Sequence, residues 1–274
     1  MGEKKGHGLF RIRNLILLIL LIVTAVSGAE VVRERMELRR QRELQESLEA
    51  LAQATTAELT METEPETESE PEETAYVSPI DFDALLAENP DTVGWIRVPD
   101  TRIDYPIVQA DDNSRYLHTD FNGADSVYGT IFLDCDSDSD LRGWNSPLYG
   151  HHMKDGSMFK DVVKFKEKDF FDEHRYFEIY TPEQTIRLQT VACYYSDSDG
   201  IVRKTQFESQ EAFDEWVQER LEPCGFADIP DVSVDSMYVL VTCSYEQDDA
   251  RTLLFAVAVD EEGNVVEATG RNVP

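Results

Sequence analysis

Positive charge is scarce in this sequence. Its 274 residues include 25 lysines and arginines against 55 aspartates and glutamates, which gives a formal net charge of −30. No basic residue lies between Arg42 and Arg97. A phosphate backbone would repel a chain with this charge, because such a backbone is bound by positive side chains that neutralise it. We therefore exclude nucleic acid as a partner.

Closely spaced metal ligands are also lacking. The four cysteines form no CxxC pair, which argues against a zinc site. The acidic run 134–140, DCDSDSD, resembles a calcium loop but lacks the glycine at its sixth position and the glutamate at its twelfth. We expect a solvated acidic loop there, with no metal and no cofactor. An even cysteine count in an exported chain permits one disulfide, for which Cys193 and Cys224 are the only pair considered; free thiols are the alternative.

A candidate anchor segment at residues 15–32, apolar from Leu15 to Val26 except for Thr24, follows a basic N-terminus of 14 residues that contains Lys4, Lys5, Arg11 and Arg13. Two interpretations compete. The small residues at 27–29 are typical of a cleaved signal peptide, whereas the length is at the short end for a spanning helix. Four arginines at positions 33–40 weaken the positive-inside argument. We favour an uncleaved anchor with residues 1–14 in the cytoplasm, and in either case we expect the remainder to be exported.

The segment 33–76 separates this run from the rest of the chain. Leucines recur among charges up to about residue 57, which predicts an exposed helical stalk. Residues 55–74 consist largely of threonine, glutamate and proline. Such a composition cannot bury a core, so we expect a disordered acidic linker. The folded domain is then predicted to occupy residues 77–274.

Short apolar runs broken by turn residues characterise the chain from residue 93 onward, with no internal repeat. This texture predicts a mainly β domain, either a closed barrel or a sandwich. Two helices interrupt it, one at 78–89 and one at 210–221, where four large apolar residues share a face. The predicted strands are 95–98, 103–108, 130–133, 176–180, 185–191, 237–243 and 252–259.

The strand at 237–243 delivers Cys243 to its end, and Arg251 opens the next apolar run. If the two strands form an antiparallel pair, these residues lie close together. A thiolate attacks carbonyl carbon, and a guanidinium suits the oxyanion that develops. Taken alone, the cysteine could equally be a small hydrophobe at a strand end, and the arginine a surface partner of Asp248 or Asp249.

A histidine completes the candidate set. His151 follows Gly150 at the end of a short apolar stretch and could act as general acid towards a leaving amine. His152 competes with it, because neighbouring residues in an extended chain point to opposite faces. The sequence assigns no role to the second imidazole.

Several of these segments resemble a sortase, and most closely a class B sortase. The resemblance covers about residues 78–259 and rests on YGH at 149–151, MKDGSMF at 153–159, TCS at 242–244 and Arg251, together with 89–96, 103–109 and 129–134. It implies a closed β-barrel of about eight strands, with helices at the N-terminus and one inserted before the cysteine-bearing strand. The helix predicted at 210–221 fits the inserted one.

The resemblance also implies a reaction. The Cys243 thiolate would cleave a C-terminal sorting signal after a threonine through a thioacyl intermediate, with His151 as acid and Arg251 as the oxyanion partner. Thr242 and Ser244, which flank the cysteine, would contact the substrate. The acceptor amine would belong to a peptidoglycan precursor or to a pilin lysine. The enzyme would be a membrane-anchored, extracellular cysteine transpeptidase of a Gram-positive cell surface.

Two other functions stay open on the residues alone. An exported papain-like peptidase is disfavoured, because those chains run cysteine then histidine and carry a CGSCW-like segment that is absent here. A non-catalytic module displayed on a stalk would carry an inert Cys243.

Overall fold

The computed structural model describes residues 5–53, 76–197, 200–243 and 250–268. The chain forms two compact units, Met1–Glu46 and Ser47–Pro274. The first consists of most of helix α1, which spans Lys5–Ala52 without interruption. The predicted acidic linker at 55–74 lies outside the described residues.

Helix α1 contains a stretch that is long and apolar enough to cross a membrane, by length and composition. A signal sequence near an N-terminus would have the same properties. Anchor and stalk, predicted as separate segments, belong to one continuous helix. Its last turns form part of the second unit, where Leu48 and Ala52 are buried and the Asp81 N–H donates to the Ala52 carbonyl at 3.0 Å. The end of α1 is therefore packed within the second unit.

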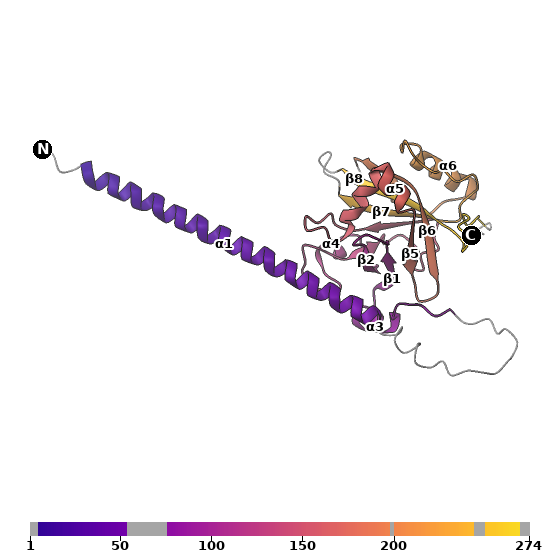
Figure 1. Cartoon of the computed structure of the whole chain (residues 1–274), viewed down its shortest axis with the longest axis horizontal. Coiled ribbons are helices and arrows are strands. Elements are labelled where there is room, and N and C mark those ends of the chain that lie inside the picture. Colours follow the sequence, from indigo (N-terminus) through magenta and orange to yellow (C-terminus); the bar gives the residue numbers. More distant parts are fainter. Residues whose placement is uncertain (1–4, 54–75, 198–199, 244–249, 269–274) are drawn as a thin grey trace. The chain divides into compact units, whose positions relative to one another are not determined.

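Eight strands close into a barrel in the order β1-β2-β3-β4-β7-β8-β6-β5 (Figure 1). Closure follows from β1, which pairs with β2 on one side and with β5 on the other. Two pairs are parallel, β2 with β3 and β4 with β7, and the other pairs are antiparallel. The predicted closed barrel is confirmed. The strands are β1 Thr92–Arg97, β2 Asp104–Val108, β3 Ile131–Leu133, β4 Asn145–Tyr149, β5 Tyr176–Tyr180, β6 Thr185–Ser196, β7 Met237–Cys243 and β8 Arg251–Ala258.

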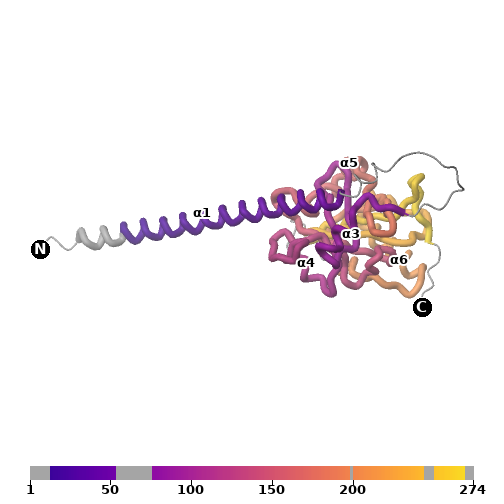
Figure 2. The backbone as a smooth tube through the Cα atoms, turned by 90° about the horizontal axis from the view of Figure 1, so that it is seen from below, coloured from indigo at the N-terminus to yellow at the C-terminus, as the bar shows by residue number. Residues whose placement is uncertain are grey.

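Short helices complete the second unit, and α5 and α6 lie on the outside of the barrel in both views (Figures 1 and 2). Helix α6 coincides with the predicted segment 210–221; Ser209 caps it by accepting a hydrogen bond from the Ala212 N–H, and its apolar face is buried. The one-sided apolar pattern therefore located this helix correctly. The helices are α3 Phe82–Glu88, α4 Arg115–His118, η1 Phe159–Lys166, α5 Lys168–Glu173, η2 Gly200–Val202 and α6 Gln210–Leu221.

Cys193 and Cys224 are both buried and free. The Cys224 thiol lies 3.4 Å from the Cys193 carbonyl oxygen, and the Cys193 thiol faces the Val162 carbonyl. Of the two alternatives that the sequence left open, the structure has the free thiols.

Candidate active site

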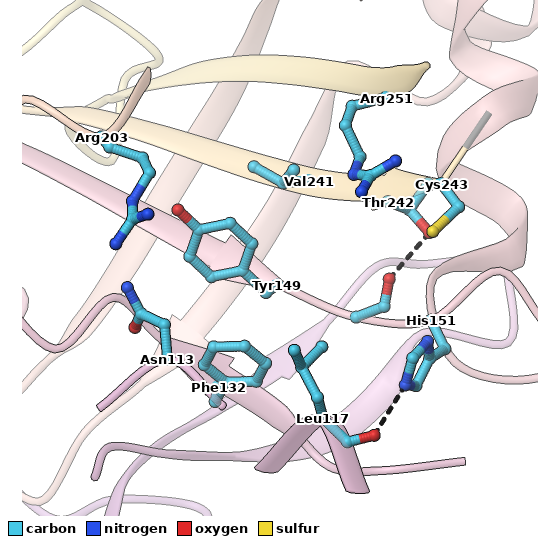
Figure 3. A pocket seen from close by; sticks show the side chains of 11 residues that line it. Asn113, Leu117, Phe132, Tyr149, His151, Arg203, Val241, Thr242, Cys243 and Arg251 are labelled. Carbon is cyan, nitrogen blue, oxygen red and sulfur yellow. Dashed lines mark hydrogen bonds between the residues drawn. The ribbon is translucent and has the colours of Figure 1, made fainter. Parts of the chain in front are cut away.

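A pocket of about 400 Å³ opens where β4 and β7 end and β8 begins (Figure 3). Two arginines line it, and no carboxylate is among the described lining residues. In a chain with a net charge of −30, this pocket is thus locally cationic. Its lining is Asn113, Leu117, Phe132, Tyr149, Gly150, His151, Arg203, Val241, Thr242, Cys243 and Arg251.

Cys243 and Arg251 are directly opposed in the antiparallel pair of β7 and β8. Directly opposed residues project their side chains on the same face of a sheet. Figure 3 shows the guanidinium of Arg251 extending towards the thiol. The juxtaposition that the sequence predicted is therefore present, with Cys243 half-buried and accessible from the pocket.

The end of β4 is fastened to β7 beside the cysteine. The Gly150 N–H donates to the Val241 carbonyl at 3.1 Å, and the Thr242 hydroxyl donates to the Gly150 carbonyl at 2.7 Å. A Cβ at Gly150 would lie 2.5 Å from the side chain of Ile131 and 2.7 Å from the ring of Phe159, so glycine lets these two side chains pack against the end of β4. Thr242 is buried and its hydroxyl serves this bond, so its substrate contact stays a prediction. Ser244 lies outside the described residues.

His151 faces the same pocket from β4. Its Nε2 lies 2.8 Å from the Leu117 carbonyl oxygen, which can only accept, so Nε2 carries a hydrogen. The other ring nitrogen, Nδ1, lies on the side of Cys243 in Figure 3. Proton exchange with the pocket therefore falls to Nδ1.

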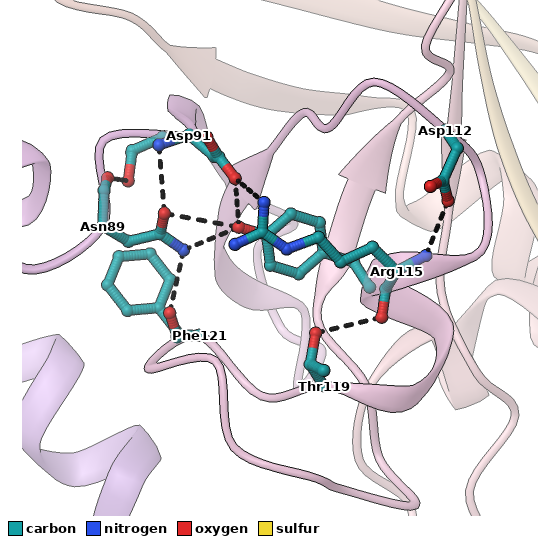
Figure 4. Close-up of polar contacts among 8 residues, drawn as sticks. Asn89, Asp91, Asp112, Arg115, Thr119 and Phe121 are labelled. Atoms are coloured by element: carbon teal, nitrogen blue, oxygen red, sulfur yellow. Dashed lines mark hydrogen bonds and ion pairs between the residues drawn. The ribbon is translucent and has the colours of Figure 1, made fainter.

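The carbonyl that holds His151 is itself held by a polar cluster around α4 (Figure 4). The buried Tyr116 hydroxyl donates to Asp91 at 2.7 Å, and Arg115 contacts the same carboxylate at 2.8 Å. Asn89 donates to the Tyr116 hydroxyl and to the Phe121 carbonyl. Helix α4 is thereby fixed to the start of β1, and the imidazole has a rigid partner.

His152 points away from His151 and is buried. Its Nδ1 lies 2.9 Å from the carbonyl oxygen of Cys243, and its Nε2 meets the Lys160 ammonium. The alternation of side chains predicted that only one imidazole would face the pocket. The sequence did not predict the bond between His152 and the backbone of Cys243, since no local pattern links residues so far apart.

At the far end of the pocket from Cys243 lie Asn113, Tyr149 and Arg203 (Figure 3). All three contact the carboxylate of Asp134, which is fully buried. The expectation of a solvated loop at 134–140 is therefore wrong for its first residue, because these partners replace water; Asp136, Asp138 and Asp140 are exposed. Asp134 lies in the segment 129–134, one of those that resemble sortases, and this resemblance was the only indication in the sequence that the residue has a role.

Cys135 is the thiol next to this carboxylate. Burial, and then the nearby carboxylates of Asp136 and Asp134, raise its pKa. The Cys135 thiol therefore stays protonated at neutral pH and makes a poor second nucleophile. The possible ligand atoms of residues 134, 135 and 136 lie within 4.8 Å of one another. Asp134 is already satisfied by hydrogen bonds, so this group gives no reason to assign a metal.

No family model matches the chain. A curated relative, sortase B of Listeria monocytogenes, is 34% identical over 161 residues, which cover 58% of this chain and 65% of that protein. The chain therefore spans slightly under two thirds of the length of this relative. The crystal structure of Clostridium perfringens sortase B is 30% identical with a TM-score of 0.61, over 65% of this chain and 99% of that one. A Staphylococcus aureus sortase B–substrate complex is 25% identical with a TM-score of 0.68, over 82% and 99% of the two chains.

Proposed function

This chain belongs to the sortase family and is class B-like, and from that premise we propose that it is a cysteine transpeptidase. It cleaves a C-terminal sorting signal after a threonine and transfers the protein to an amine of the cell wall. The observation that supports this proposal is the meeting of Cys243, Arg251 and His151 in one pocket at the ends of β7, β8 and β4.

In the first half-reaction the Cys243 thiolate attacks the backbone carbonyl carbon of the threonine. A carbon–sulfur bond forms and the carbonyl oxygen becomes negative. Arg251 lies opposite the cysteine and donates to this oxyanion with a fixed positive charge. The carbon–nitrogen bond then breaks, and the leaving amine takes a proton from Nδ1 of His151, whose Nε2 remains bonded to Leu117.

In the second half-reaction an acceptor amine attacks the thioester carbon. It returns a proton to Nδ1 of His151, a new amide bond forms and the thiolate leaves. No cofactor takes part. The acceptor is the amine of a peptidoglycan precursor, with a pilin lysine as the second candidate, and the substrates are surface proteins that carry the sorting signal.

The location follows from α1. Its apolar stretch, preceded by a basic N-terminus, supports a single membrane span with residues 1–14 inside the cell and the barrel outside. The enzyme would then meet its substrates and the wall precursor at the outer membrane face.

The test is the intact mass of the full-length chain in detergent after incubation with LPxTG-like and NPxTx-like peptides. We expect wild type to gain the mass of the peptide up to its threonine, with loss of the downstream residues, and Cys243→Ala to gain nothing. An added amine should then release a transpeptidation product.

Other outcomes separate the two alternatives. An adduct that water resolves, with no product from any amine, would indicate an exported cysteine peptidase. No adduct, together with a Cys243 that reacts with iodoacetamide no faster than an ordinary thiol, would indicate a non-catalytic display module.

A further inference from the structure

Asp134 follows β3 directly, and the mechanism above gives it no part. Its side chain is 0% exposed. Burying a carboxylate is costly unless charged or hydrogen-bonding partners surround it. The identity of those partners therefore indicates what the buried charge stabilises.

Three side-chain partners of Asp134 come from three separate segments. The Tyr149 hydroxyl, on β4, donates at 2.9 Å, and the Asn113 amide, before α4, donates at 3.0 Å. The guanidinium of Arg203, between β6 and β7, lies 3.7 Å away. All three line the pocket of the cysteine, whereas Asp134 is behind them and is not among the lining residues.

These partners occupy the end of the pocket that lies away from Cys243 and His151 (Figure 3). We propose that Asp134 is a positioning residue, which holds Tyr149, Asn113 and Arg203 in the arrangement that binds the part of the sorting signal remote from the scissile bond. This inference rests on the proposed function and extends it from the reacting atoms to the recognition of the peptide.

The segment that carries Arg203 is fixed from both sides. The Asn145 amide donates to the carbonyls of Val202 and Lys204, and the Thr205 hydroxyl donates to the Asp136 carbonyl. Arg203 itself is 49% exposed, so its guanidinium can reach both Asp134 and a bound peptide. A neutral residue at position 134 would loosen three binding groups together without touching the thiol, the imidazole or Arg251.

The experiment uses steady-state turnover by the full-length chain, with the peptide that wild type cleaves best, and compares Asp134→Asn with wild type. Asparagine keeps the shape and one accepting oxygen but removes the charge. We expect KM to rise about tenfold while kcat changes less than about twofold, because binding is affected and the chemical step is not. The rate at which iodoacetamide labels Cys243 should stay the same.

Two further variants separate positioning from a general loss of structure. Asp136→Asn makes the same substitution two residues along the loop at an exposed carboxylate, and should leave KM unchanged. Tyr149→Phe removes only the hydroxyl and keeps the ring stacked on Phe132, at 5.1 Å between centroids. It should raise KM by itself yet add little to Asp134→Asn, because the two groups act as a unit.

Four results would overturn the inference. An unchanged KM in Asp134→Asn, where wild type turns the peptide over, removes it and leaves the proposed function standing. A fall in kcat or in thiol labelling at constant KM would mean that Asp134 acts on the chemistry instead. No turnover of any peptide by wild type would remove the proposed function and this inference with it. If Asp134→Asn fails to fold, an unchanged KM in Tyr149→Phe overturns the inference in the same way as the first result.

Discussion

His152 contacts the backbone of Cys243, and its two ring nitrogens have different partners. The Cys243 carbonyl can only accept, so Nδ1 of His152 carries the hydrogen; the Lys160 ammonium can only donate, so Nε2 offers its lone pair. His152 thus contacts both the backbone of Cys243 and the side chain of Lys160. It connects the end of β4 to the last described residue of β7, and so fixes the backbone from which the thiol projects.

His152→Ala should lower kcat about fivefold with little change in KM. The loss of one hydrogen bond to the nucleophile's backbone is worth about 1 kcal/mol, and each 1.4 kcal/mol is about tenfold in rate. The measurement is steady-state kinetics on the peptide that wild type prefers. His152→Asn places an amide donor near the position of Nδ1 and should recover most of the rate. Unchanged kcat in the alanine variant would show that the contact has no part in positioning Cys243.

The sequence located the candidate reacting residues better than the residues that support them. Cys243, His151 and Arg251 could be proposed because strand ends and chemistry coincide, and the structure brings them into one pocket. The partner of His151 could not be found, since a backbone carbonyl such as that of Leu117 leaves no trace in residue type. Asp134 was misjudged because its partners come from distant segments.

At the scale of elements, the connection from β6 to β7 is held against β4 rather than left loose. Asn145, fully buried at the start of β4, donates from one amide to the carbonyls on either side of Arg203. The position of Arg203 is thus set by β4, a strand that lies far upstream of it in the sequence.

Asn145→Ala should lower the free energy of unfolding by about 2 kcal/mol and raise KM for the peptide, because the carbonyls of Val202 and Lys204 lose their donor and Arg203 loses its support. Chemical denaturation and steady-state kinetics give the two values. Ser209→Ala is the matched control: it removes the cap of α6 at a cost of about 1 kcal/mol and should leave KM unchanged. If KM also stays unchanged in Asn145→Ala, the arginine does not depend on this anchor.

Strands were predictable where apolar and β-branched residues dominate, as in β7 and β8. Strand β4 shows the limit, because Asn145, Ser146 and Pro147 are typical of a turn, yet this strand is buried along its whole length between β3 and β7. The side chain of Asn145 is held there by its bonds to the Val202 and Lys204 carbonyls, tertiary contacts that a local pattern does not contain. The continuous α1 was divided in the prediction because composition changes along it while the helical conformation does not.

At the scale of the whole molecule, four buried or partly buried tyrosines make the free energy of unfolding depend on pH in the alkaline range. Burial is the main cause that raises the pKa of Tyr105, Tyr116, Tyr180 and Tyr194 to about 12 from the ordinary value of 10.0. The folded state thus keeps protons that the unfolded state would lose. Their contribution is fully present below pH 10.0, and it is lost as pH rises through about 12.

We therefore expect alkaline unfolding to begin above about pH 10 and to coincide with a late, cooperative rise in tyrosinate absorbance. Each ionisation also adds negative charge to a chain that already carries −30, so added salt should move the transition to higher pH. Circular dichroism and absorbance recorded on the same samples check this. Gradual tyrosine titration at the ordinary pKa, with the fold intact, would contradict it.

The strand order also determines at which stage of folding the barrel can close. Strands β7 and β8 are among the last made, yet they occupy the space between β4 and β6, which have no sheet partner on those sides until the pair inserts. Closure of the barrel must thus wait for these two strands, and long-range pairings of this kind form slowly. Cys243 therefore reaches its position opposite Arg251 in the same event that closes the barrel.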